Sequence, residues 1–242
     1  MCTVTWWRDE PAGAFSVWFN RDERRARRAS EPVRLQTADD GTRFLAPRDP
    51  AAGGTWLLAN AHGLVVGVLN HYAPVVEVGQ TATTVYSRGQ LPLRFASCRS
   101  VAEVDKFAQA MAPDQFAPFI VVACDAARTA TWVWDGARLL TDFAPQRPLT
   151  TSSYRSAEVC AWRRARFSAV ATPPSVEALA AYHDDVAHAD PAFNVRMRRP
   201  DARTESVCRV SVTREEIRFL HRRESPDAIA ALDSHEAVLA RT

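Results

Sequence analysis

Short apolar runs separated by turn residues fill the first third of the chain, a pattern typical of antiparallel strands. Residues 3–7 and 15–19 are rich in β-branched and aromatic side chains, and the turn-forming residues 9–13 lie between them. This order predicts a β-hairpin. Residues 55–58 and 64–69 predict two further strands around the turn at 60–63, whereas the polar stretch 21–53, rich in Arg and Pro, predicts mostly loop.

Helical spacing begins after Ser100. Ser100 and Glu103 have the spacing of a capping box, and apolar residues then recur at helical intervals, so a helix is predicted over 101–112. Residues 156–170 and 175–188 predict two more helices, separated by Pro173 and Pro174. Strands are predicted over 119–123, 131–134, 205–212 and 217–221, with a hairpin turn at Asp135-Gly136. Residues 228–239 have weak helical character.

The order of these elements indicates the fold class. Strands, a helix, strands, two helices and strands follow one another, without the regular alternation of strand and helix that a parallel sheet requires. This order favours an antiparallel α+β arrangement, with two sheets and helices packed outside them. No linker separates two parts of the chain, so one domain spanning residues 1–242 is expected.

Composition excludes several classes of function. The net charge of +2 argues against an extended basic surface for nucleic acid, and no apolar run reaches the roughly 18 residues of a membrane span. The five cysteines are widely spaced and include no C-x-x-C pair, which excludes a disulfide framework and a zinc site and favours a reducing compartment. Charged residues at 8–10 interrupt the first apolar segment, so no signal peptide is expected and a cytoplasmic location is predicted.

Cys2 is the sharpest candidate for chemistry. It directly follows Met1 and is small enough to permit removal of that methionine, after which one residue would present both a thiol and an α-amine. The amine has a reference pKa of about 7.7–8.0, so it can accept the thiol proton and later return it to a leaving group. The alternatives are a structural cysteine and a palmitoylation site, and the second lacks a neighbouring myristoylation signal or basic anchor.

A second candidate, Asn20-Arg21-Asp22-Glu23, ends the second predicted strand. If this strand pairs with the one that begins at Cys2, Asn20 and Asp22 face one side of the sheet and Arg21 faces the other. A carboxylate there could hold the α-amine, and an Arg could lower the pKa of the thiol. The alternative is a solvated charged corner, because four more arginines follow within residues 24–28.

Further candidates stand at the ends of predicted elements, each with a structural alternative. Trp56 follows paired glycines and could form a wall for a ligand or belong to the core. Asn70 could donate to an oxyanion or simply end a strand. The segment Thr150-Thr-Ser-Ser153 could bind an oxyanion or cap the next helix. Arg203 could bind a substrate carboxylate or be a surface charge.

Six segments occur here in one order: Met1-Cys-Thr-Val4, Asn20-Arg-Asp-Glu23, Gly53-Gly-Thr-Trp56, Gly67-Val-Leu-Asn70, Thr150-Thr-Ser-Ser153 and Arg203-Thr-Glu-Ser206. Together they resemble the Transport and Golgi organisation protein 2 family, also called the NRDE family. That family is similar to the N-terminal nucleophile hydrolases, such as bile salt hydrolases and penicillin V acylases. The resemblance implies a four-layer αββα sandwich of two antiparallel sheets, with the mature N-terminal Cys as nucleophile.

The resemblance also implies roles for individual residues. In those acylases an Arg-Asn-x-Asp stretch ends the second strand. Asn20 and Asp22 keep its Asn and Asp, while Phe19 stands at the position of its Arg and Arg21 lies within the motif. The other implied positions are Asn70 for an oxyanion-binding Asn, Ser152 or Ser153 for a second Asn, and Arg163 or Arg164 for a later Arg.

Two functions from different classes follow. In the first, Cys2 hydrolyses a non-peptide amide of a small molecule through an acyl-enzyme, Asp22 holds the amine, Arg21 tunes the charge around the thiol, and Asn70 with a backbone N–H near Ser153 stabilises the oxyanion. No cofactor or metal is expected for it. In the second, implied by the links of eukaryotic family members to lipid metabolism and haem trafficking, the chain is a non-catalytic carrier of haem or a lipid-like ligand. The oligomeric state stays open.

Overall fold

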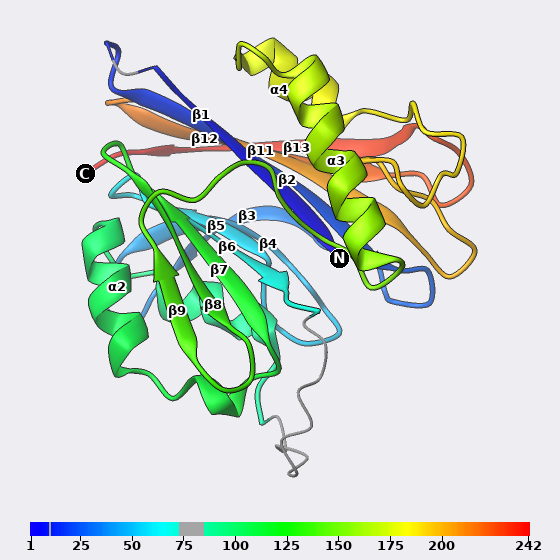
Figure 1. Cartoon of the computed structure of the whole chain (residues 1–242). Helices are drawn as coiled ribbons and strands as arrows, with labels where there is room; N and C mark the ends of the chain where they lie inside the picture. Colours follow the sequence, from blue (N-terminus) through cyan, green and yellow to red (C-terminus); the bar gives the residue numbers. More distant parts are fainter. Residues whose placement is uncertain (10, 73–84) are drawn as a thin grey trace.

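Two antiparallel sheets lie face to face, with helices on their outer faces (Figure 1). The computed structural model describes residues 1–9, 11–72 and 85–242. The sheets have six and seven strands, in the orders β10-β1-β2-β11-β12-β13 and β3-β4-β5-β6-β7-β8-β9. This is the four-layer αββα arrangement, so the predicted α+β fold class is confirmed.

The six-stranded sheet contains strands from both the beginning and the end of the chain. Its central pair, β2 and β11, runs antiparallel, and β1 lies on the other side of β2. Because β1 is followed by β2 through a tight hairpin, the first residue of the first strand lies beside the last residues of the second. The strands are β1 (Cys2–Asp9), β2 (Ala14–Arg24), β10 (Leu149–Thr151), β11 (Ala202–Val212), β12 (Glu216–Glu224) and β13 (Ala231–Ala240).

The seven-stranded sheet is a meander in which each strand pairs with the next one along the chain. Its strands are β3 (Glu31–Thr37), β4 (Arg43–Arg48), β5 (Leu57–Asn60), β6 (Val65–Asn70), β7 (Phe119–Cys124), β8 (Thr129–Trp134) and β9 (Leu139–Asp142).

Two groups of helices complete the outer layers. The helices α1 (Leu91–Arg94) and α2 (Val101–Ala110) contact the seven-stranded sheet, while α3 (Ser156–Val170) and α4 (Val176–His183) lie on the six-stranded one (Figure 1). Two 3₁₀ turns, η1 (Arg88–Gln90) and η2 (Pro113–Gln115), flank the first group. Within the described part of the chain, no helix is long and apolar enough to cross a membrane.

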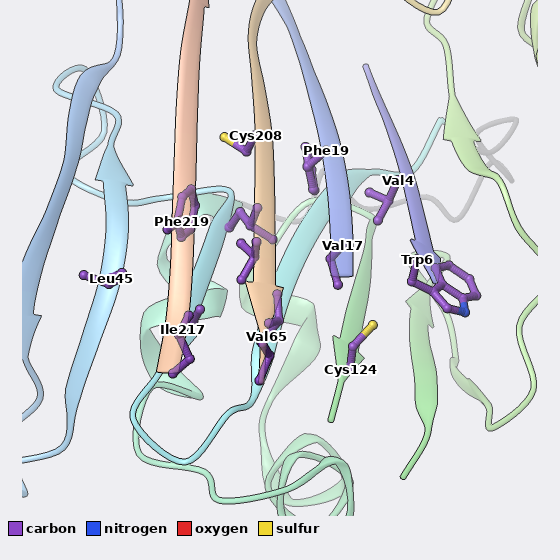
Figure 2. Packing of buried hydrophobic residues seen from close by; sticks show 14 of the residues in the cluster. Val4, Trp6, Val17, Phe19, Leu45, Val65, Cys124, Cys208, Ile217 and Phe219 are labelled. Atoms are coloured by element: carbon purple, nitrogen blue, oxygen red, sulfur yellow. The ribbon is translucent and has the colours of Figure 1, made fainter. Parts of the chain in front are cut away.

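The main core lies between the two sheets (Figure 2). Strand alternation sends Val4 and Trp6 of β1, and Val17 and Phe19 of β2, into this layer. Their neighbours on β1 and β2 point outward, toward α3 and α4. Each such buried side chain contributes about 1.5–3 kcal/mol of hydrophobic stabilisation, so the core fixes which face of β1 and β2 each residue occupies.

Most predicted elements are confirmed. The hairpin is β1 and β2, although Glu10 of its predicted turn lies outside the described residues. The predicted helix at 101–112 is α2, and the Ser100 side chain accepts a hydrogen bond from the Glu103 N–H at 3.3 Å, as expected of a cap. The helix predicted at 156–170 is α3, whereas the one predicted at 175–188 ends earlier, at His183, as α4. The strand pairs predicted at 119–134 and 205–221 are β7 with β8 and β11 with β12.

Two predictions are wrong, both at sheet edges. The stretch 21–53 is not mostly loop, because it contains the end of β2 together with β3 and β4. The segment 228–239 is not helical, because it contributes most of β13. Both β3 and β13 are edge strands with few buried side chains, and they form by pairing with a neighbouring strand. In β13, pairing with β12 overrides the helix propensity of its alanines.

Candidate functional site

A cleft of about 420 Å³ opens where β1 begins and β2 and β6 end. Cys2 lies in its wall, at the first position of β1, and its side chain also contacts the core between the sheets. Within the six-stranded sheet Cys2 pairs with Arg21 on one side and Thr151 on the other. The predicted pairing of the first strand with the Asn20–Glu23 segment is therefore confirmed.

The Cys2 thiol occupies a desolvated position. Only 7% of the residue is exposed, and burial raises the pKa of its thiol above the ordinary value. The positive N-terminus and Arg21 act against this rise, while the negative charge of Asp22 adds to it. A thiol in this position is mostly protonated at neutral pH, so a nucleophilic role requires a nearby proton acceptor.

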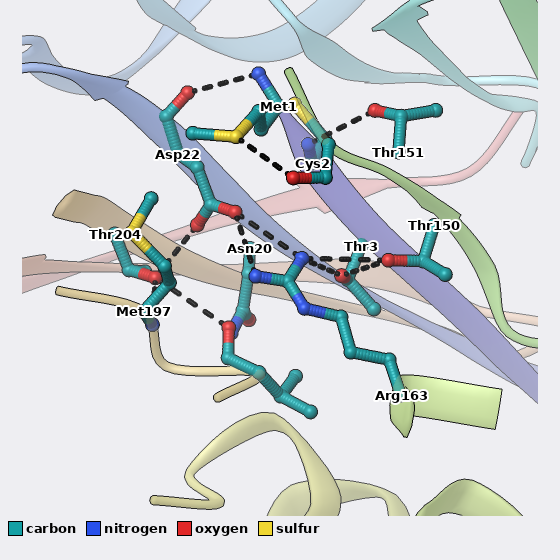
Figure 3. A network of polar contacts seen from close by, with 12 residues as sticks. Met1, Cys2, Thr3, Asn20, Asp22, Thr150, Thr151, Arg163, Met197 and Thr204 are labelled. Carbon is teal, nitrogen blue, oxygen red and sulfur yellow. Dashed lines mark hydrogen bonds and ion pairs between the residues drawn. The ribbon is translucent and has the colours of Figure 1, made fainter. Parts of the chain in front are cut away.

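In this structure Met1 is joined to the Cys2 nitrogen by a peptide bond (Figure 3). Its ammonium donates to the carbonyl of Asp22 at 3.3 Å and to the hydroxyl of Tyr72 at 3.1 Å. Its side chain packs against Met197 and Tyr72. The Cys2 N–H meanwhile donates to Thr151 Oγ1 at 3.3 Å. Removal of Met1 would convert that peptide nitrogen into an α-amine beside the thiol.

Asp22 is tied into a buried polar network behind the cleft wall (Figure 3). Its Oδ2 accepts from both terminal nitrogens of Arg163, at 3.3 and 3.4 Å, and its Oδ1 accepts from Thr204 Oγ1 at 2.7 Å. Arg163 also donates to Thr3 Oγ1 at 3.0 Å and to the carbonyl of Asn194 at 2.8 Å. The network holds the ends of β1, β2 and β11 against α3.

Asn20 faces the same helices and lies outside the cleft. Its amide donates to the carbonyls of His183 and Val195 at 2.9 and 3.0 Å, and its Oδ1 contacts His183 Nδ1 at 2.7 Å. The other nitrogen of His183 contacts Thr5 Oγ1 at 2.8 Å. Burial lowers the pKa of His183 to about 3, so the ring is neutral. Asn20 thus fastens α4 to β1 and β2.

Arg21 points to the opposite face of β2, as alternation predicts. Its guanidinium lies 4.5 Å from the centre of the Trp56 ring. It forms ion pairs with Glu205 at 3.0 Å and Glu23 at 3.3 Å. Glu205 in turn accepts from the backbone and hydroxyl of Ser30, at 3.0 and 2.8 Å. Arg21 and Trp56 both line the cleft, where the guanidinium is held between an aromatic face and a buried carboxylate.

Asn70 stands at the end of β6, in the wall of the cleft. Its amide donates to the Tyr72 hydroxyl at 3.0 Å, and burial raises the pKa of Tyr72. Arg88 lines the cleft as well, and one of its terminal nitrogens donates to the carbonyl of Pro118 at 3.0 Å. Neither Tyr72 nor Arg88 was among the sequence candidates.

The remaining candidates separate into three groups. Ser153 lines the cleft, whereas Ser152 is buried behind it and donates to the Tyr154 carbonyl at 2.7 Å. Arg203 lies outside the cleft and donates to the Glu224 carbonyl at 2.8 Å. Arg164 is exposed on α3, next to the buried Arg163. The structure therefore gathers six candidates around one cleft: Cys2, Arg21, Asp22, Trp56, Asn70 and Ser153.

Several residues of this site were not predicted from the sequence, among them Glu205, Tyr72 and Arg88. Glu205 belongs to the Arg203–Ser206 segment, from which Arg203 was chosen as a candidate. The segment was therefore identified correctly, but the residue that contacts Arg21 is Glu205. Tyr72 follows Asn70 by two positions and could have been found as a neighbour. Arg88 carries no local signal, because only the fold brings it to the cleft.

Comparisons with known proteins agree with this architecture. The family model described as Transport and Golgi organisation 2 matches residues 1–155. No curated protein matches the sequence. A penicillin V acylase from Agrobacterium tumefaciens aligns with a TM-score of 0.54 and 14% identity, over 99% of this chain and 86% of its own. A conjugated bile acid hydrolase from Clostridium perfringens aligns with a TM-score of 0.58 and 12% identity, over 99% and 96%. Both have N-terminal nucleophile hydrolase folds, and the likeness concerns the fold.

Proposed function

The chain belongs to the Transport and Golgi organisation 2 family, and on that premise we propose that it cleaves a non-peptide C–N amide of a small molecule through an acyl-enzyme on Cys2. The observation that carries the proposal is the place of Cys2, at the first position of β1 and in the wall of a cleft of about 420 Å³. There a thiol and, once Met1 is removed, an α-amine can meet the same bound molecule.

The amine is the proton acceptor that the thiol needs. Burial raises the pKa of the Cys2 thiol, whereas a free α-amine has a reference pKa of about 7.7–8.0. The amine therefore takes the thiol proton as the sulfur attacks the carbonyl carbon. In this proposal Asp22 holds the amine. Its backbone N–H and carbonyl contact Met1, so Asp22 lies beside the nitrogen that removal of Met1 frees, and its carboxylate is fixed in place by Arg163.

The reaction then proceeds in two balanced steps. The sulfur–carbon bond forms, the carbon–nitrogen bond breaks, and the proton held by the amine passes to the leaving nitrogen. Water next attacks the thioester, giving the carboxylic acid and restoring the thiol. Asn70 and a backbone N–H near Ser153 stabilise the oxyanion in both steps, a role supported by their place in the cleft wall. Arg21, the residue that pairs with Cys2 on the neighbouring strand β2, favours the thiolate.

The first test compares two cysteine variants that differ only in position. Cys2 and Cys160 are both 7% exposed, but Cys160 lies on α3, outside the cleft. After intact mass has confirmed that Met1 is removed, Cys2→Ala should abolish the hydrolysis of activated amide and ester probes, and Cys160→Ala should retain it. Hydrolysis by Cys2→Ala at the unaltered rate would remove Cys2 from the mechanism.

The same variants distinguish the carrier alternative. A carrier would bind haem or a lipid-like ligand without turnover, and Cys2→Ala would bind a lipid-like ligand as tightly as the unaltered chain. Binding of haem through Cys2 would instead give a Soret band that this variant loses. Either result, together with no turnover of any probe by the unaltered chain, would replace the hydrolase proposal with the carrier.

A further inference from the structure

The negative charges in the cleft wall are paired with arginines, and among the lining arginines the exposed Arg24 and the partly buried Arg88 have no ion pair within the described residues. Four described carboxylates line the cleft, and each has a guanidinium partner. A carboxylate that is already paired has less attraction for a cationic ligand, so the wall has no strong site for one. The partners are Arg163 for Asp22, Arg21 for Glu23, Arg27 for Asp49 and Arg199 for Asp201.

Arg88 differs from the other partly buried arginines of the wall. No carboxylate in the described residues forms an ion pair with it. Arg88 lines the cleft, and apart from the bond of Nη1 to the Pro118 carbonyl its guanidinium has no hydrogen-bond acceptor among the described residues. Burial lowers the pKa of Arg88, while Tyr72, Cys2 and Glu23 act in the opposite direction. A partly desolvated cation of this kind is stabilised by an anionic ligand.

The Gly53–Trp56 segment contacts the turn that positions Arg88 at the cleft. The Thr55 N–H donates to the Gly89 carbonyl at 2.8 Å, which ties the turn carrying Arg88 to this segment. A Cβ atom at Gly54 would lie only 2.3 Å from the same carbonyl oxygen, so glycine permits the contact. Gly54 therefore lets the turn that carries Arg88 pack closely against Thr55, in the wall of the cleft that Cys2 also lines.

We propose that Arg88 binds a carboxylate carried by the substrate, so that the amides cleaved here bear a negative charge near the scissile bond. The inference rests on the proposed function for its substrate class. One partly buried guanidinium without a described partner matches one negative charge, which favours a carboxylate over a doubly charged phosphate ester. The planar fork of Arg can bind both carboxylate oxygens, and this fixes the orientation of the amide relative to Cys2.

The test uses two alkylating reagents of similar size and different charge. Iodoacetate and iodoacetamide both form a thioether on Cys2 and release iodide, but only iodoacetate carries a carboxylate. The two rates on the full chain are measured by mass spectrometry of the N-terminal peptide, and their ratio is divided by the ratio for free cysteine. The normalised ratio should exceed one, and Arg88→Gln should lower it about tenfold, the effect of one charge-assisted hydrogen bond.

Two further variants keep the test decisive. Arg88→Lys keeps the charge and should retain part of the preference for iodoacetate, even if Arg88→Gln weakens the fold and slows both reagents. Arg164→Gln removes an exposed arginine outside the cleft and should leave the ratio unchanged. An equal ratio in the unaltered chain, Arg88→Gln and Arg88→Lys would overturn the proposal.

Failure of the inference and failure of the proposed function are distinguishable. Alkylation requires no amide hydrolysis, so a preference for iodoacetate that depends on Arg88 would stand even if no amide were cleaved. If amides are cleaved, Arg88→Gln should raise KM for hexanoylglycine about tenfold with little change in kcat, because it removes binding shared by substrate and transition state. The neutral hexanoylglycinamide should be unaffected, and an equal rise in KM for both amides would contradict the assignment of Arg88.

Discussion

Helices cover the outer faces of both sheets, but the two interfaces differ in chemistry. Against the seven-stranded sheet, α1 and α2 bury a continuous apolar cluster that includes Leu58 and Trp132. Against the six-stranded sheet, the apolar contacts around Trp18 share the interface with the buried Asp22–Arg163 pair. The first interface is apolar apart from neutral hydrogen-bonding groups such as the Trp132 N–H, which donates to Asp105 of α2 at 2.9 Å. The second interface contains a buried ion pair.

This difference indicates that one interface mainly stabilises the fold and that the other mainly positions the residues of the cleft. A buried ion pair is often no more stable than apolar side chains of the same volume, so the pair is not explained by stability alone. It lies directly behind Cys2, and its directional hydrogen bonds join the ends of β1, β2 and β11 to α3. Such bonds hold a site in a defined geometry more strictly than apolar contacts do. We infer that the polar interface serves the cleft and that the apolar interface serves the fold.

Arg163→Met should cause the largest loss of stability, because it leaves the carboxylate of Asp22 buried without its cation. The expected loss in the free energy of unfolding is about 3–5 kcal/mol, measured by denaturant titration. Arg164→Met, at the exposed neighbouring position, should change stability by less than about 0.5 kcal/mol.

A second substitution sharpens this result. Adding Asp22→Asn to Arg163→Met removes the uncompensated charge and should restore part of the lost stability. If the double variant were as unstable as Arg163→Met alone, the loss would come from packing, and the contrast between the interfaces would fail.

Leu58→Ala tests the apolar interface. Leu58 is fully buried beneath the first group of helices, so its truncation should cost about 2–5 kcal/mol. Folded Leu58→Ala should nevertheless react with iodoacetamide at Cys2 at the unaltered rate, because it leaves the polar network intact. Folded Arg163→Met should change that rate, because it removes the cation of the network behind Cys2. An equal change in both variants would contradict the division of roles.

The pH dependence of stability should come partly from His183. Its pKa is about 3 in the folded chain and about 6.5 as a reference, so between these values the unfolded chain binds a proton that the folded chain does not. The stabilising contribution is thus complete above pH 6.5 and is lost as pH falls toward 3. From pH 7 to pH 5, the unaltered chain should lose about 2 kcal/mol more than His183→Gln, and equal losses would exclude this role.

Ser100→Ala should give the smallest effect. It removes the side-chain cap of α2 and should lower stability by about 1 kcal/mol, with no change in the pH dependence. Ser168→Ala, at an exposed position within α3, is the matched control and should stay within about 0.5 kcal/mol of the unaltered chain. An equal loss in both variants would show that the cap contributes nothing.

Local patterns in the sequence were sufficient for the elements that form through neighbouring residues. The hairpin of β1 and β2 follows from alternation, and it alone places Cys2 beside Arg21. The α2 cap follows from the spacing of Ser100 and Glu103. The edge strands β3 and β13 were missed because they bury few side chains and depend on a partner strand that no local pattern identifies.

The deeper parts of the site depend on contacts between distant residues. Arg163 meets Asp22 across 141 positions, and Glu205 meets Arg21 across 184. Arg88 reaches the cleft because Gly54 permits a close backbone contact. The residue types in the motifs indicated the chemistry of the cleft, but only the packing of the layers decides which side chain faces it. Asn20 and Arg203 therefore stood among the candidates although both lie outside the cleft.

The central claim is that Cys2 is acylated during turnover, and trapping the acyl group tests it most directly. The processed chain is mixed with an activated amide or ester, quenched in acid and digested, and the N-terminal peptide is examined by mass spectrometry. We predict the mass of one acyl group on Cys2, its disappearance as water resolves the thioester, and no acylated peptide from Cys2→Ala. Hydrolysis of the probe with Cys2 unmodified at every time point, or with Met1 still attached, would contradict the account.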